Sequence, residues 1–123
     1  MGSEMCIRDR ENIIKTSEIK VQIGLNDNNL PIRIKWTATD GNVDNQEARA
    51  MLLSLWDPNE KNTMKIDLWT KDMSVEEMKQ FFHQTLLTLS DTFEKATGEH
   101  KICEDLRDYC YHFADKMDIL PSE

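Results

Sequence analysis

Apolar and polar residues alternate along two stretches near the start of the chain. Between residues 19 and 25, and again between 30 and 38, every second position is apolar and most positions between are polar. A period of two predicts two half-buried strands. The Asn-Asp-Asn-Asn sequence at 26–29 is typical of a turn, because Asn and Asp tolerate left-handed backbone. We therefore expect a hairpin, with Pro31 placing the second strand at a sheet edge and the first in the centre.

The next segment combines a helical pattern with a strand pattern. Apolar residues at positions 48, 51, 52 and 55 share one helical face, and Asp44 with Glu47 fits a capping box. These features predict a helix that begins near residue 44, ends before Pro58 and directs Trp56 into the core. Apolar residues then alternate from 64 to 68, which predicts a third strand joined to the second by a right-handed crossover. Its outer edge is expected to be free to pair with a second chain.

Two long amphipathic stretches complete the chain. Ser74 and Glu77 form a second capping box, and Gly98 can end the helix that follows. A second apolar stripe from residue 102 to 117 predicts a last helix of about 18 residues. The expected fold is α+β: a small three-stranded, mostly antiparallel sheet with amphipathic helices packed on one face. The order is strand, strand, helix, strand, helix, helix.

Length and charge limit the classes of function. The 123 residues suffice for one domain, which we place at 13–123. Residues 1–12 show no periodicity and partly resemble translated sequencing-adapter sequence, so we interpret them as a non-native or disordered segment. A net charge of −8 argues against nucleic acid or an anionic membrane surface as the partner. No apolar run is long enough for membrane insertion.

Known patterns of catalytic and metal-binding residues are missing or incomplete. Residues 40–44 space three oxygen ligands as the start of a calcium loop does, but the sixth and twelfth positions of the pattern fail. The three histidines, His83, His100 and His112, lack zinc-site spacing. Cys103 and Cys110 are interpreted as core-facing thiols, which with the lack of a leader favours a cytoplasmic location. We expect no catalytic residues, cofactor or metal.

Trp69 is the residue that most suggests a binding surface. By the strand period it lies on the face of Thr63, Lys65 and Asp67, opposite the apolar residues of the same strand. An outward Trp among charged residues is typical of a partner-binding anchor, because Trp is enriched in binding hot spots. The alternative is a ring that lies over a neighbouring lysine stem or under a loop.

Several blocks of the sequence are similar to one known family. The most distinctive block, at 61–73, contains Ile-Asp-Leu-Trp-Thr-Lys-Asp-Met, and it leads into Glu-Met-Lys-Gln-Phe-Phe-His-Gln-Thr at 77–85. Further matching blocks lie at 15–20, 36–41, 47–51 and 90–98. Over nearly all of 15–119 the chain resembles the GldC family of gliding-motility proteins.

The resemblance implies a soluble accessory protein of the gliding machinery and its linked secretion system, with no enzymatic activity. Our leading hypothesis is a protein-interaction module whose partners are components of that machinery, bound through Asp67, Trp69, Lys71 and Asp72. The alternative is a small-ligand-binding or enzymatic domain with a pocket near His83 and Trp36. A third hypothesis is a homodimer formed through the open edge of the third strand.

Overall fold

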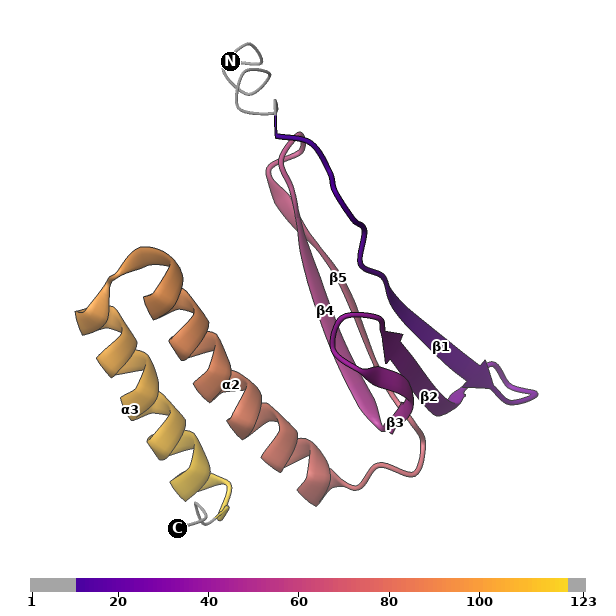
Figure 1. The fold of residues 1–123 in the computed structure, drawn as a ribbon. Coiled ribbons are helices and arrows are strands. Elements are labelled where there is room, and N and C mark those ends of the chain that lie inside the picture. The colour runs from indigo at the N-terminus through magenta and orange to yellow at the C-terminus, as the bar shows by residue number, and fades with distance from the viewer. Residues whose placement is uncertain (1–10, 120–123) are drawn as a thin grey trace. The chain divides into compact units, whose positions relative to one another are not determined.

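The computed structural model describes residues 11–119, which divide after Lys71 into two compact units. The first, called here the β unit, holds five strands, and the second, the helical unit, holds two helices. Figure 1 shows the elements in chain order. The α+β class is confirmed, while the packing of the helices on one face of the sheet stays a prediction. Of the segment 1–12, residues 1–10 lie outside the described part, so its interpretation stays untested.

The first sheet of the β unit contains the predicted hairpin. β1 (Ile19–Leu25) pairs antiparallel with β2 (Pro31–Ala38), and β3 (Val43–Ala48) pairs antiparallel with the other side of β2. The sheet order is therefore β1-β2-β3. Our placement of the first strand in the centre was wrong. Pro31 is the first residue of β2, where a missing backbone donor disturbs only the end of the ladder.

The predicted helix after residue 44 was also wrong, and with it the right-handed crossover. The chain instead forms β3 and then β4 (Ala50–Asp57), which pairs antiparallel with β5 (Asn62–Trp69) as a separate two-stranded sheet. Asn45 has a φ of 56°, which the first turn of a right-handed helix does not allow. The nearly continuous apolar run in β4 satisfies the periods of both helix and strand, and eight cross-strand pairs with β5 decide for the strand. Trp56 is 64% exposed, so its predicted place in the core was wrong.

The two helices of the helical unit lie close to where the sequence pattern predicted them. α2 (Val75–Thr97) begins at the predicted capping box: Glu77 donates its backbone N–H to Ser74 Oγ, and Ser74 donates its own to Glu77 Oε1. Gly98 follows with a φ of 74°, the left-handed conformation that glycine adopts without strain. α3 (His100–Lys116) is one residue shorter than expected. No helix among residues 11–119 is long and apolar enough to cross a membrane.

Burial is confined to a few side chains in each unit. In the β unit Ile34 of the central strand is 1% exposed and Thr70, just after β5, is 2% exposed. The larger apolar residues Leu89 and Ile102 of the two helices are about half-exposed. The buried residues of the helices are small or polar: His83, Ser90, Cys103, Cys110 and Ala114. Small side chains such as Ser90, Cys103 and Ala114 allow two helices to approach closely, which fits the packing of α2 against α3.

Candidate functional site

The two sheets of the β unit are joined at one corner by backbone hydrogen bonds. Arg49, between β3 and β4, accepts a 2.8 Å bond from the backbone N–H of Thr70. Lys71 donates its backbone N–H to the carbonyl oxygen of Pro31 at 3.0 Å. The end of β5 is thereby held between the start of β2 and the bend that separates β3 from β4. Buried Thr70 lies at the centre of this corner, which fixes the backbone on either side of it.

A pocket of about 310 Å³ opens beside this corner. Its lining is mostly apolar and comes from the start of β2 and the end of β5: Leu30, Pro31, Asp67, Leu68, Trp69 and Lys71. Consecutive strand residues point to opposite faces of a sheet. A pocket lined by residues 67, 68 and 69 together therefore lies at the edge of β5 rather than on one of its faces.

Three of the four residues singled out from the sequence line this pocket. Trp69 is 54% exposed, and it lies on the face of Lys65 and Asp67, as the strand period predicted. Lys65 Nζ lies 2.6 Å from Asp67 Oδ2, so the Asp67 carboxylate already has a partner. Lys71 completes the set, whereas Asp72 is not among the lining residues. These placements leave the partner-binding role of all four residues as a prediction.

The sequence did not predict that Leu30 and Pro31 would contribute to the site. Both were assigned to the start of a strand on the alternation of apolar residues alone. They reach β5 because the Lys71 N–H bonds to the Pro31 carbonyl across 40 residues of chain. No local pattern in the sequence signals that bond.

The alternative pocket near His83 and Trp36 stays a prediction. Trp36 is partly buried in β2, and His83 is 7% exposed in α2, so the two residues belong to different units. His83 Nε2 is buried without a hydrogen-bond partner among the described residues. The pocket at the edge of β5 includes neither residue.

The residues considered as metal ligands are placed apart or used otherwise. Residues 40–44, with their partial calcium pattern, lie where β2 turns into β3, and Asn42 there has a left-handed φ of 57°. Across residues 11–119, no three His, Cys, Asp or Glu side chains are grouped closely enough to hold a metal ion. Cys103 and Cys110 are both free and buried. Burial raises the pKa of the Cys103 thiol, which keeps it protonated and unreactive.

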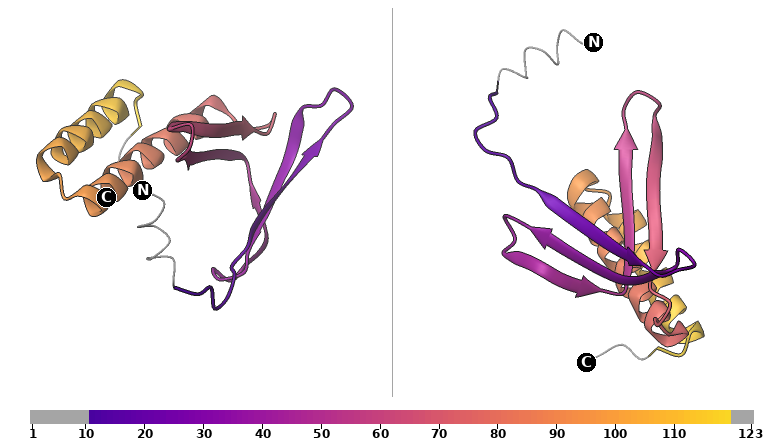
Figure 2. Two further views of the ribbon diagram at one scale, coloured as in Figure 1. Left: turned by 90° about the horizontal axis from the view of Figure 1, so that it is seen from above. Right: turned by 90° about the vertical axis from the view of Figure 1, so that its right-hand side faces the viewer.

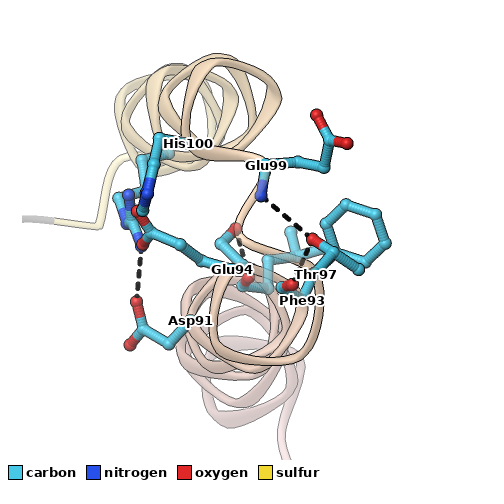
Figure 3. A network of polar contacts seen from close by, with 9 residues as sticks. Asp91, Phe93, Glu94, Thr97, Glu99 and His100 are labelled. Carbon is cyan, nitrogen blue, oxygen red and sulfur yellow. Dashed lines mark hydrogen bonds and ion pairs between the residues drawn. The ribbon is translucent and has the colours of Figure 1, made fainter.

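A polar network joins α2 to α3 near their connecting turn (Figure 3). His100 Nδ1 lies 2.6 Å from Glu94 Oε2, and the Arg107 guanidinium donates to Glu94 Oε1 and, at 3.0 Å, to Asp91. The hydrogen bonds from His100 and then from Arg107 lower the pKa of Glu94. The same carboxylates raise the pKa of Arg107. Because Arg107 of α3 donates to two carboxylates of α2, the network links the two helices.

Comparison of the sequence with models of known protein families identifies the family of this chain. The model of the family described as gliding motility-associated protein GldC-like matches residues 31–119, which include four of the five strands and both helices. Neither the curated proteins nor the solved structures include a significant match to this chain. The match covers well over half of the sequence and agrees with the resemblance carried by the blocks around Trp69 and Phe82. The chain therefore belongs to the GldC-like family of gliding motility-associated proteins.

Proposed function

We propose that this protein is a non-enzymatic interaction module that binds a component of the gliding machinery or of its linked secretion system. The observation that carries the proposal is the half-exposed Trp69 beside a mostly apolar pocket at the edge of β5. Membership of a gliding motility-associated family supports the machinery as the source of the partner. The free thiols Cys103 and Cys110 support a reducing compartment, so we propose that the protein acts in the cytoplasm.

The chemistry around Trp69 favours contact with a protein. Its indole combines a large apolar surface with one N–H donor, a combination that makes Trp common among binding hot spots. The adjacent pocket is at the small end of the range for ligand sites, about 300–1,000 Å³. Such a volume suits one or two inserted side chains. Leu30, Pro31 and Leu68 would surround the inserted group, while Trp69 covers one side of it.

The charged groups of the site support binding rather than catalysis. A general base needs a carboxylate that is free to accept a proton from a substrate. The Asp67 carboxylate is instead engaged by Lys65 at 2.6 Å. In our proposal this ion pair and Lys71 form a polar margin around the apolar contact, as in many protein interfaces.

The test compares two tryptophans of the same hairpin. Trp69 and Trp56 lie on the same face of β4 and β5, at opposite ends, and are 54% and 64% exposed. In a gliding bacterium we expect Trp69→Ala to abolish partner capture and slow gliding, and Trp56→Ala to leave both unchanged. A photo-reactive residue at position 69, but not at 56, should cross-link to a machinery component.

Circular dichroism and tryptophan fluorescence of the purified variants provide the folding control. If folded Trp69→Ala protein captures the same components as Trp56→Ala protein, the placement of the interface at Trp69 is wrong. If saturable binding of a metabolite instead perturbs His83, the alternative of a small-ligand-binding domain replaces it.

A further inference from the structure

Among residues 11–119, no strand pairs with the outer edge of β5. In the sheet formed by β4 and β5, β5 has one neighbour only, and Figure 2 shows the turn end of this hairpin lying clear of β1, β2 and β3. Thr70 bonds toward Arg49 on the β4 side, and Lys71 bonds toward Pro31 on the opposite side. Backbone groups alternate in direction along an antiparallel strand. The N–H and C=O groups of residues 63, 65, 67 and 69 therefore point to the outer edge.

We propose that this edge pairs with the same edge of a second copy of the chain. The two β5 strands would run antiparallel about a two-fold axis and join the two hairpins into one four-stranded sheet. An isolated two-stranded hairpin is only marginally stable in water, and four strands with a shared apolar face are more stable. A two-fold contact needs a surface that complements itself.

Hydrogen bonding and charge together select one register. Because residues 63, 65, 67 and 69 carry the outward groups, they must pair with one another across the axis. Pairing Lys65 with the second copy's Asp67 satisfies this condition and places opposite charges together twice. Shifting either strand by two residues would oppose Lys65 to Lys65 or Asp67 to Asp67, and like charges directly opposite are destabilising. The existing 2.6 Å pair of Lys65 and Asp67 would then become part of a ring of four alternating charges.

The same register matches the remaining side chains. Ile66 lies on the axis, opposite its own copy, and Met64 lies opposite Leu68 on the same apolar face. Trp69 lies opposite Thr63 on the other face. In the single chain Met64 is 56% exposed and Ile66 51% exposed, so both are available for the contact. A lysine on an edge strand ordinarily discourages pairing with another strand. Here Asp67 lies two residues after Lys65, so one register places each lysine opposite an aspartate of the other copy.

The length of the free edge also fits this register. Pairing residues 63–69 with residues 69–63 uses nearly the whole of β5 (Asn62–Trp69). The edge ends where Lys71 is already bonded to Pro31, so β2 begins where the second copy's strand would stop. The edge of β4 would not favour one register in the same way, because β4 carries no charged side chain between Ala50 and Trp56.

The test uses cysteine cross-linking of the full chain. Residues 66 and 66 would form a non-hydrogen-bonded pair with Cα atoms about 4.5 Å apart, within disulfide reach. Residues 64 and 64 would be offset by four positions, about 13 Å along the strand, which is out of reach. In a Cys6→Ser background, we expect mild oxidation to convert Ile66→Cys to a covalent dimer and to leave Met64→Cys as monomer. The two positions are similarly exposed, so random collisions would cross-link both equally.

Light scattering on the unmodified chain should give twice the 14.4 kDa mass of one copy. Lys65→Asp or Asp67→Lys alone should weaken the dimer about tenfold, and the two together should restore it, because each reversed charge again meets its opposite. A monomeric mass at 100 μM, equal cross-linking at positions 64 and 66, or no restoration by the double exchange would overturn the proposal. The proposal would also be overturned if the chain were monomeric and its Ile66→Cys variant cross-linked to a different protein.

The dimer and the machinery contact would use the same edge of β5, because the pocket lies there and Trp69 would lie opposite Thr63 of the second copy. Each proposal therefore has a readout of its own. The dimer is read from residue 66 on purified protein, and the machinery contact is read from residue 69 in cells. A dimer whose Trp69→Ala variant still captures the machinery would contradict the proposed interface alone. A monomer that loses capture on the same substitution would contradict the dimer alone.

Discussion

The β unit and the helical unit differ in where the deciding interactions lie along the chain. In α2 the first turn is fixed by Ser74 and Glu77, three residues apart, and the end is fixed by Gly98 next to the last helical residue. In the β unit, β4 is a strand because Ala50 pairs with Trp69, 19 residues later, and Lys71 reaches back 40 residues to Pro31. The comparison shows that helix boundaries can be set by local chemistry, whereas these strands depend on distant partners.

The two units also bury different kinds of side chain. The helices bury small residues such as Cys103 and Ala114, which allow close approach. The β unit buries the large side chain of Ile34 in its central strand, while Leu55 and Met64 of the long hairpin stay more than half exposed. Stability in the β unit should therefore depend strongly on one position.

The largest expected effect comes from Ile34→Ala. Removing a fully buried Ile side chain costs about 2–5 kcal/mol of unfolding free energy. Trp36, Trp56 and Trp69 all lie in the β unit, so their fluorescence during urea unfolding reports that unit. Circular dichroism at 222 nm reports the helices. We expect the fluorescence transition to move to much lower urea concentration.

Ile32→Ala provides the matched control for this prediction. It lies two residues away in β2 and is 47% exposed, so its removal should cost much less. Equal losses for the two variants would show that Ile34 is not the principal buried residue of the sheet.

The same contrast explains which parts of the fold could be predicted from the sequence. The first hairpin was predictable because alternation in residues 19–25 and 31–38 has only one interpretation, with a turn sequence between. The segment 43–57 was not, because Met51 and Leu55 fit a helical face and also, together with Leu53, a strand face. Only the pairing of Leu53 with Ile66 and of its neighbours resolves this ambiguity, and pairing is not written in the local sequence.

The sequence contains two capping-box patterns, at Ser74 and at Asp44, and only the first caps a helix. Substituting Ser74 should give the next largest loss of unfolding free energy. Ser74→Ala should cost about 1 kcal/mol, because the backbone N–H of Glu77 loses its acceptor. Asp44→Ala should change stability by less than about 0.5 kcal/mol, because Asp44 is an exposed strand residue that caps no helix. Urea unfolding followed at 222 nm for Ser74→Ala and by fluorescence for Asp44→Ala checks both values. A loss at Asp44 as large as that at Ser74 would contradict the assignment of β3.

The candidate site was predictable in part for the same physical reason. The face on which Trp69 lies follows from the period-two pattern of its own strand, so the sequence sufficed for that. Its exposure does not follow from the pattern, because Met64 and Ile66 on the opposite face are 56% and 51% exposed. The pocket depends on Leu30 and Pro31, which are near in space only through the corner bonds of Thr70 and Lys71. A sequence can therefore indicate an outward anchor before it indicates the cavity beside it.

The smallest expected effect is a pH dependence confined to the helical unit. The hydrogen bonds from His100 and Arg107 hold the pKa of Glu94 below its usual value of 4.5. A carboxyl with a lowered pKa in the folded state adds stability that is complete above the unfolded value and is lost as pH falls through the folded value. The helical signal should thus become less stable toward urea as pH drops below about 4.5, and Glu94→Gln should reduce this acid sensitivity. Glu104→Gln, at an exposed position of α3, controls for the loss of one negative charge. Glu94 links α2 to α3, so the pH dependence of the β-unit fluorescence transition should be the same in the Glu94→Gln protein as in the unmodified chain. If the substitution instead changes the pH dependence of both the fluorescence and the helical signal, the network stabilises more than the helix pair.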